Sequence, residues 1–102
     1  MRTEPDDVDA AIKLLPVRSV FRTGEGAVRV LFLLPHSLWR PLRASWWTGK
    51  EVYVIGADPD GNYLLRHSDG TVRYWNHRKQ MDEVVAPSVR AFLASLVPPN
   101  GP

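Results

Sequence analysis

Three histidines are the side chains of this sequence best suited to acid–base chemistry or metal binding: His36, His67 and His77. A metal site or a catalytic triad needs such side chains close together, with carboxylates or thiolates beside them. A two-residue Asp69-Gly70 turn would place His67 and His77 on opposite faces of a β-hairpin, because side chains alternate along a strand. The chain has no cysteine and none of the short motifs of serine hydrolases, phosphate-binding loops or zinc proteases. We therefore expect no catalytic residue, no metal ligand and no cofactor.

The acidic run Asp58-Pro59-Asp60-Gly61-Asn62 shares its first residues with a calcium-binding loop. An EF-hand also needs glycine at its sixth position and glutamate at its twelfth, where this chain has Tyr63 and Asp69. Proline, aspartate and glycine are also the residues that form tight turns, since they set φ, bond the local backbone and accept an open angle. The run therefore predicts a turn between two strands.

Arginine and tryptophan are residue types that often anchor protein interfaces, and they gather in two stretches of this chain. In the first, the same two-residue turn would place Arg66 directly opposite Arg73, with Trp75 beside the pair. Like charges at facing positions repel each other, so either both guanidinium groups extend into water or this face meets an acidic partner. The second stretch, 39–50, mixes basic and aromatic residues, a pattern that also suits single-stranded nucleic acid.

Four tryptophans in so small a chain must partly serve its core. We expect one or two of Trp39, Trp46 and Trp47 to be core residues. Together the two stretches define a predicted partner-binding surface. Its residues are Trp39, Arg40, Arg43, Trp46, Trp47, Arg66, Arg73 and Trp75.

The net charge of +2 hides an asymmetry along the chain. The first ten residues hold four acids and one arginine, and the rest has 12 basic and 7 acidic residues, a net charge of +5. Ten of the 13 basic residues are arginine. This bias suits bidentate contacts to carboxylates or phosphates, although a GC-rich genome also produces it.

Length and composition predict one soluble domain over residues 1–102, with flexible ends at 1–5 and 98–102. The longest apolar run, 30–34, is far shorter than the roughly 20 residues of a membrane-spanning helix. The acidic start of the chain is unlike a signal peptide, and the lack of cysteine fits a reducing compartment. We therefore expect a cytoplasmic protein that does not contact membranes.

The hydrophobic pattern predicts an α+β domain, in which a short N-terminal helix and a C-terminal helix pack on an antiparallel β-meander sheet. The helices are expected over 6–15 and 88–97, bounded by prolines. The second helix would place Val89, Phe92, Leu93 and Leu96 on one face. A loop with one helical turn is expected over 35–50. The expected strands are 17–22 and 27–34, joined by the turn 23–26, followed by 52–55, 62–68, 71–77 and 81–85.

Three segments of the second half, 55–65, 72–77 and 85–93, share a pattern with one known family. They are Ile55-Gly56-Ala57-Asp58-Pro59-Asp60-Gly61-Asn62-Tyr63-Leu64-Leu65, Val72-Arg73-Tyr74-Trp75-Asn76-His77 and Val85-Ala86-Pro87-Ser88-Val89-Arg90-Ala91-Phe92-Leu93. They resemble the strand–turn–strand, the next strand and the closing helix of the SUKH superfamily, which includes a fungal regulator of cell-wall synthesis and many bacterial immunity proteins. The resemblance covers roughly 52–97. Asn76 and Arg78 stand where the family usually has acids beside His77, and Pro87 replaces an acidic helix cap.

The resemblance implies a non-enzymatic α+β domain in which Trp75, His77, Phe92 and Leu93 are residues of the fold. It also implies that the domain binds and neutralises a bacterial toxin encoded nearby. Because immunity proteins against basic nucleases tend to be acidic, the basic charge favours an acidic or non-nuclease toxin, or another protein. A single-stranded nucleic-acid-binding module and a structural or adaptor subunit are the alternatives. We expect a protein partner rather than nucleic acid, and a monomer or weak homodimer.

Overall fold

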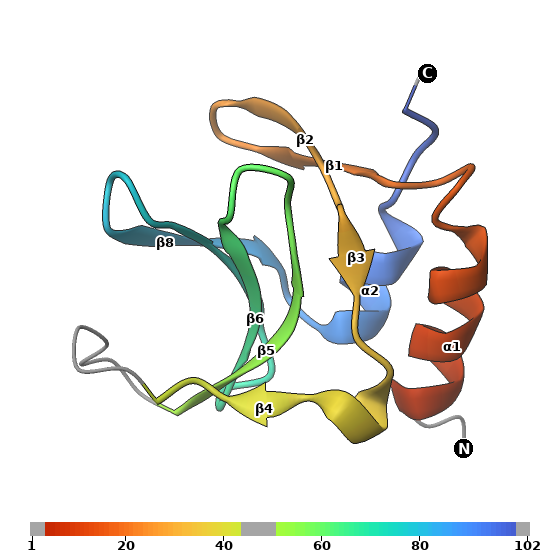
Figure 1. The fold of residues 1–102 in the computed structure, drawn as a ribbon, viewed down its shortest axis with the longest axis horizontal. Helices are drawn as coiled ribbons and strands as arrows, with labels where there is room; N and C mark the ends of the chain where they lie inside the picture. The colour runs from red at the N-terminus through yellow and green to blue at the C-terminus, as the bar shows by residue number, and fades with distance from the viewer. Residues whose placement is uncertain (1–3, 44–50, 100–102) are drawn as a thin grey trace.

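The computed structural model describes residues 4–43 and 51–99 of the chain (Figure 1). In these residues a mainly antiparallel sheet is accompanied by one N-terminal and one C-terminal helix, which confirms the predicted α+β fold class. The helices are α1 (Glu4–Leu14) and α2 (Val89–Ala94), and a short 3₁₀ helix, η1, spans His36–Leu38. The strands are β1 (Val20–Thr23), β2 (Gly26–Arg29), β3 (Phe32–Leu33), β4 (Arg40–Pro41), β5 (Val52–Ala57), β6 (Tyr63–His67), β7 (Val72–Asn76) and β8 (Met81–Ala86).

The main sheet has the strand order β3-β5-β6-β7-β8, and β4 pairs with β5 beside this path. The four strands predicted between 52 and 85 are confirmed as β5 to β8. A β-bulge between Val54 and Gly56 interrupts the pairing of β5 with β6. Beside the bulge, β3 passes so close to β5 that a Cβ at Gly56 would lie 2.5 Å from the carbonyl oxygen of Phe32. Glycine permits this approach because it has no side chain.

The strands β1 and β2 form a separate two-stranded hairpin (Figure 1). The hairpin is tied to the main sheet at its tip, where the Gly24 amide donates to a Glu83 carboxylate oxygen at 2.7 Å. The predicted strand over 27–34 is wrong in its extent, because β2 ends at Arg29 and the chain crosses to the main sheet as β3. The crossing buries Val30 at the base of the hairpin.

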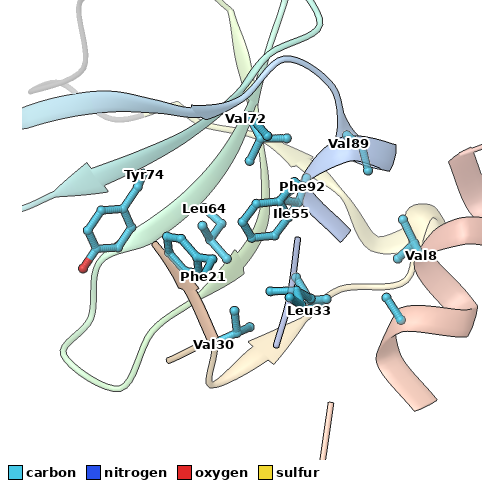
Figure 2. Packing of buried hydrophobic residues seen from close by; sticks show 13 residues of the cluster. Val8, Phe21, Val30, Leu33, Ile55, Leu64, Val72, Tyr74, Val89 and Phe92 are labelled. Carbon is cyan, nitrogen blue, oxygen red and sulfur yellow. The ribbon is translucent and has the colours of Figure 1, made fainter. Parts of the chain in front are cut away.

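The main core is built from the sheet, the first hairpin and the two helices. Figure 2 shows Phe21 of β1 between Tyr74 of β7 and Phe92 of α2. The ring centroid of Phe21 lies 5.5 Å from that of Tyr74 and 5.2 Å from that of Phe92, in edge-on contacts. Phe92 is fully buried, as its position in the apolar stripe predicts. Burial of such a side chain contributes about 1.5–3 kcal/mol, so this junction is a main source of stability.

A second, smaller core lies on the opposite face of the main sheet. It contains Val52 of β5, Leu65 of β6 and Trp75 of β7. Leu64, the neighbour of Leu65, belongs to the main core instead, because successive side chains of a strand point to opposite faces. The central strands therefore bury both of their faces, which explains why they are apolar without a clear alternation.

The turn between β6 and β7 is longer than predicted. The His67 amide donates to the Thr71 carbonyl oxygen at 2.9 Å, so the turn has three residues, 68–70, instead of the two residues Asp69-Gly70. The Gly70 amide donates to the His67 carbonyl oxygen at 2.8 Å, and the φ of Gly70 is +90°. A turn followed by a glycine in this left-handed region is the usual three-residue hairpin loop.

The third turn residue shifts the register of β6 and β7 by one position. Arg66 faces Val72, so the predicted placement of Arg66 directly opposite Arg73 is wrong. A shift of one residue moves a side chain to the other face of the sheet, and the two arginines lie on opposite faces. The cause is local, because the Asp69 carboxylate accepts hydrogen bonds from the amide and hydroxyl of Thr71, at 2.9 and 2.6 Å, and these close the longer loop.

The N-terminal helix differs slightly from the prediction. It begins at Glu4, within the segment 1–5 that the sequence predicts to be flexible. The amides of Val17 and Arg18 donate to the Leu14 carbonyl oxygen at 2.9 and 2.8 Å and end the helix shortly before β1. Residues 1–3 and 100–102, also predicted to be flexible, lie outside the described residues.

The C-terminal helix is shorter than the predicted helix over 88–97. Ser88 caps its start, and its hydroxyl accepts a hydrogen bond from the Ala91 amide at 3.0 Å. The helix ends at Ala94, because Val97 pairs with Val20 of β1 in an antiparallel bridge. The bridge joins the end of the described chain to the first hairpin.

Candidate functional site

The structure does not bring Arg66, Arg73 and Trp75 together on one exposed face. Arg66 lies on the opposite face of the sheet, and Trp75 is only 8% exposed within the second core. Arg73 shares the face of Trp75, but its guanidinium group is ion-paired with two carboxylates. Its Nη1 lies 2.9 Å from Oδ2 of Asp82, and its Nη2 lies 3.1 Å from Oδ2 of Asp69. The prediction of an exposed arginine–tryptophan face is therefore wrong, since these side chains serve the fold.

The other predicted surface, in the stretch 39–50, is only partly within the described residues. Trp39 is half-buried against the main core, and its Nε1 donates to the Leu34 carbonyl oxygen at 3.1 Å. Arg40 and Arg43 are exposed, and their side chains have no hydrogen-bond or ion-pair partner in the described part of the chain. Trp46 and Trp47 lie outside the described residues. Of this stretch, two arginines and the edge of one tryptophan are therefore placed where a partner could reach them.

A buried polar network occupies the turn that the acidic run 58–62 forms. The Asp58 carboxylate accepts hydrogen bonds from the amides of Asp60 and Asn62, at 3.0 and 2.8 Å. It also accepts from Asn62 Nδ2 at 3.0 Å and from the Tyr74 hydroxyl at 2.5 Å. The carboxylate thus receives four donors, and the network links the turn after β5 to the centre of β7.

The network also orients a histidine. Because Asn62 Nδ2 donates to Asp58 and Tyr74, its Oδ1 accepts from the His77 backbone amide at 3.0 Å. The same Oδ1 lies 2.7 Å from His77 Nδ1, so this ring nitrogen must carry a proton. Among the described residues no group of three or more His, Asp or Glu side chains is placed to hold a metal ion. The hydrogen bonds of the network instead connect the β5–β6 turn to the β7–β8 turn.

The pKa shifts of the network follow from burial and hydrogen bonding. Burial by itself raises the pKa of the Asp58 carboxyl, but its bonds from Tyr74 and Asn62 outweigh this and hold the pKa below the ordinary value of 3.8. Burial, together with the nearby Asp58 carboxylate, raises the pKa of the Tyr74 hydroxyl above its usual range. Asp58 is thus ionised and Tyr74 protonated at neutral pH, which is the state in which the bonds between them form.

The outward face of the β1–β2 hairpin carries exposed arginines. Phe21 and Val28 face each other and point into the core, so the alternate side chains point outward. The Val30 amide donates to the Ser19 carbonyl oxygen at 2.7 Å and extends the ladder by one pair. We name the outward side chains the arginine face. Its residues are Arg18, Val20, Arg22, Ala27, Arg29 and Leu31.

The three arginines of this face have no acidic partner among the residues that the structure describes. The side chains of Arg18, Arg22 and Arg29 are exposed and form no hydrogen bond or ion pair in the part of the chain that the structure describes. The nearby acids are engaged elsewhere, because Glu25 is paired with Lys79 and Glu83 caps the Gly24 amide. The face therefore presents its guanidinium groups to solvent, beside an aliphatic side chain, that of Leu31, which is 58% exposed.

Two hollows flank the base of the arginine face. The larger, of about 430 Å³, is named here the Leu31 hollow. It is lined by Leu15, Pro16, Ser19, Arg29, Val30, Leu31 and Pro59. The smaller, of about 200 Å³, lies between α1 and α2, and Arg18 forms part of its wall. Apolar hollows beside unpaired arginines are features of protein interfaces.

The arginine face was not among the residues predicted from the sequence, although a signal for it exists. Arg18, Val20 and Arg22 alternate with Ser19 and Phe21. Two of the even-numbered residues are therefore basic, while the odd-numbered residues are buried. Tryptophan is a stronger indicator of an interface than this alternation. Alternation alone also leaves open whether acids elsewhere in the chain neutralise the arginines.

Comparison with known proteins finds no family model, no curated protein and no solved structure that matches this chain. The resemblance to the SUKH superfamily thus stays a prediction. Within residues 4–43 and 51–99, neither helix is long and apolar enough to cross a membrane.

Proposed function

We propose that this domain acts without catalysis, by binding one acidic protein partner in a stoichiometric complex. The observation that supports the proposal is the arginine face, where three arginines that have no acidic partner among the described residues lie beside an exposed leucine. Arginine at an interface forms bidentate bonds with carboxylates and loses relatively little hydration when it is covered. A partner that supplies carboxylates would therefore gain affinity here, and its approach would be accelerated by the opposite charge.

The composition of the face favours a protein over single-stranded nucleic acid. Proteins that bind single strands stack the bases on aromatic side chains, whereas Val20, Ala27 and Leu31 are the neighbours of the arginines here. Aliphatic side chains between arginines suit a partner with apolar side chains among its acids. Nucleic-acid binding would appear as an affinity that falls steeply with salt concentration.

The more specific form of this proposal is that the partner is a bacterial toxin encoded nearby, and that the domain is an immunity protein of the SUKH type. Its support is the resemblance over 52–97 and the basic charge, which favours an acidic or non-nuclease toxin. Arg40, Arg43 and the edge of Trp39 form a second exposed basic region. In this proposal the partner contacts the arginine face first, and the 39–50 stretch is a further contact.

Co-expression with the products of neighbouring genes tests the function. The chain should copurify with one of them and should restore growth if that product is toxic. Copurification without rescue would indicate an adaptor, and failure of every neighbour to copurify would contradict the proposal of a partner encoded nearby.

Two sets of charge reversals test the location of the site. The first replaces Arg18, Arg22 and Arg29 with glutamate, and the second makes the same change at three other exposed arginines, Arg40, Arg43 and Arg78. We expect the first set to weaken binding at least about thirtyfold, the loss expected for one interface anchor of about 2 kcal/mol. Loss with the second set alone would place the site in the 39–50 region instead.

A further inference from the structure

We infer that the Leu31 hollow seats one large apolar side chain of the partner, next to a partner carboxylate that Arg29 binds. This inference rests on the proposed function and adds the chemistry of the partner's contact segment, an aromatic or leucine residue flanked by acids. Four of the residues that line the hollow are Leu15, Pro16, Val30 and Leu31, which are apolar, and Arg29 is its one basic residue. The hollow can therefore contact an apolar side chain and an adjacent carboxylate at the same time.

The hollow is large enough to admit a large side chain together with part of its backbone. Sites for drug-sized molecules span about 300–1,000 Å³, and at about 430 Å³ the hollow lies near the lower end of this range. Interface anchors are typically large side chains that fill such hollows and exclude water from the charges beside them. The smaller hollow between α1 and α2 is a weaker candidate, because its second arginine, Arg90, already interacts with another residue.

The walls of the Leu31 hollow are held by rigid parts of the fold. Val30 is buried in the main core near Phe21 and Leu33 (Figure 2). The Leu31 amide donates to the Ala57 carbonyl oxygen at 2.8 Å, which fixes the rim of the hollow to the main sheet. A site with walls fixed before binding loses little conformational entropy when it is filled.

Another part of the wall depends on the polar network. Pro59 lines the hollow and directly follows Asp58, whose carboxylate receives the four hydrogen bonds of the network. The network thus holds the turn that carries Pro59. This gives the buried carboxylate a role in binding as well as in stability, although it lies too deep to contact the partner itself.

The positive charge beside the hollow favours acidic residues on either side of the partner residue whose side chain enters it. Arg29 is exposed and has no hydrogen-bond or ion-pair partner for its side chain in the described residues. Arg18, which is also exposed, lies at the other hollow, between α1 and α2. A carboxylate next to an inserted side chain would be drawn to this positive surface, and an ammonium group would be repelled.

Three short peptides, each acetylated and amidated, test the inference by amide NMR titration of the full chain. The first has a central tryptophan with two glutamates on each side, the second has alanine in place of tryptophan, and the third has lysines in place of the glutamates. We expect the first peptide to bind at least about tenfold more tightly than the second, because a large apolar side chain becomes buried. The shift changes should centre on the amides of Val30 and Leu31, and the lysine peptide should not bind there.

Two pairs of variants sharpen the titration. Arg29→Met should weaken the binding of both glutamate peptides, while Arg22→Met, a matched change farther along the same face, should have a smaller effect. Leu31→Ala should weaken the tryptophan peptide selectively, while Met81→Ala, a change of an exposed apolar side chain on β8, should leave both affinities unchanged.

The outcomes separate this inference from the proposed function. Equal binding of the tryptophan and alanine peptides would overturn the inference while leaving a cationic protein-binding face. Shift changes away from the hollow, or no binding of the tryptophan peptide at millimolar concentration, would also overturn it. The proposed function is decided independently, by copurification with a neighbouring product. Displacement of the peptide by single-stranded DNA at about 150 mM salt would contradict both, because the face would then serve nucleic acid.

Discussion

The β6–β7 and β1–β2 hairpins both carry one arginine on each strand among apolar residues, yet the surroundings of these arginines differ. In the β6–β7 hairpin, Arg73 is ion-paired with Asp69 and Asp82, and Trp75 is buried beside it. In the β1–β2 hairpin, Arg22 and Arg29 have no partner among the described residues. The β6–β7 hairpin supplies strands to the centre of the main sheet, whereas the β1–β2 hairpin lies outside that sheet and has only its inner face covered.

The comparison shows that an arginine becomes available to a partner through its surroundings more than through its local sequence. A guanidinium group within a sheet that is covered on both faces needs intramolecular acids, since an unpaired charge is costly to bury. A guanidinium group on a hairpin with one open face can stay in water at little cost. The two hairpins should therefore respond differently to substitution.

The largest effect should come from Phe92 of α2, which packs against the β1–β2 hairpin. Phe92 is fully buried and contacts Phe21, which in turn contacts Tyr74. Phe92→Ala should lower the free energy of unfolding by about 3–5 kcal/mol, because it leaves a cavity where α2 packs against Phe21 of β1. Chemical denaturation measures this change. Met81→Ala, at a side chain that is 64% exposed, should shift it by less than about 0.5 kcal/mol, and equal effects of the two changes would contradict the packing described here.

The next effect should come from the polar network and should depend on pH. Asp58→Asn should lower the free energy of unfolding at pH 7 by about 2 kcal/mol. Both carboxylate oxygens accept hydrogen bonds, whereas an amide has only one oxygen that can do so. The pKa of Asp58 is lower in the folded chain than its ordinary value of 3.8. Its ionised form therefore stabilises the fold above pH 3.8, and this contribution is lost as the pH falls through the folded-state pKa.

The measurement is the difference in stability between the variant and the unmodified chain from pH 7 down to pH 2.5. We expect the difference to shrink below about pH 4, near the ordinary pKa. The pKa of Asp69 is also lowered, first by its bonds from Thr71, but this residue is present in both proteins and cancels in the difference. A constant difference over the whole range would contradict a stabilising role for the Asp58 charge.

The smallest effects on stability are expected from substitution of one arginine in each hairpin. Arg73→Met should lower the free energy of unfolding by about 1 kcal/mol, because it removes two ion pairs of partly exposed groups and leaves Asp69 and Asp82 uncompensated. Arg29→Met should change it by less than about 0.5 kcal/mol. Denaturation at low and high salt measures both, and salt should reduce only the effect at Arg73. A larger loss at Arg29 than at Arg73 would reverse the comparison.

Much of the fold could be predicted from local patterns in the sequence. The Asp58–Gly61 turn, the four strands from β5 to β8 and the burial of Phe92 follow from turn chemistry and apolar spacing, which act over a few residues. The β6–β7 register could not be predicted in the same way. An aspartate followed by glycine suits both a two-residue and a three-residue turn, and the Asp69 side chain, through its bonds to Thr71, closes the longer one.

The candidate site was harder to predict than the fold. Residue type alone favours Trp75 and Arg73, but in the central sheet Trp75 is buried and Arg73 is ion-paired. Arg18 and Arg29 gave a weaker sequence signal, although they remain open to a partner in the structure. Residue type indicates what a side chain could bind, but burial and intramolecular pairing decide whether it is free to do so.

The sequence by itself determined the α+β class, the order of the central strands along the chain and the apolar stripe of the last helix, because these depend on contacts between near neighbours. Only the tertiary structure decided which face of each strand is covered and which arginines find a carboxylate. Asp82 reaches Arg73 because β7 and β8 are paired, and Pro59 meets Leu31 at one hollow because the turn after β5 lies beside the base of the first hairpin. Such contacts depend on how segments that are distant in the sequence pack together, and no local sequence pattern predicts this packing.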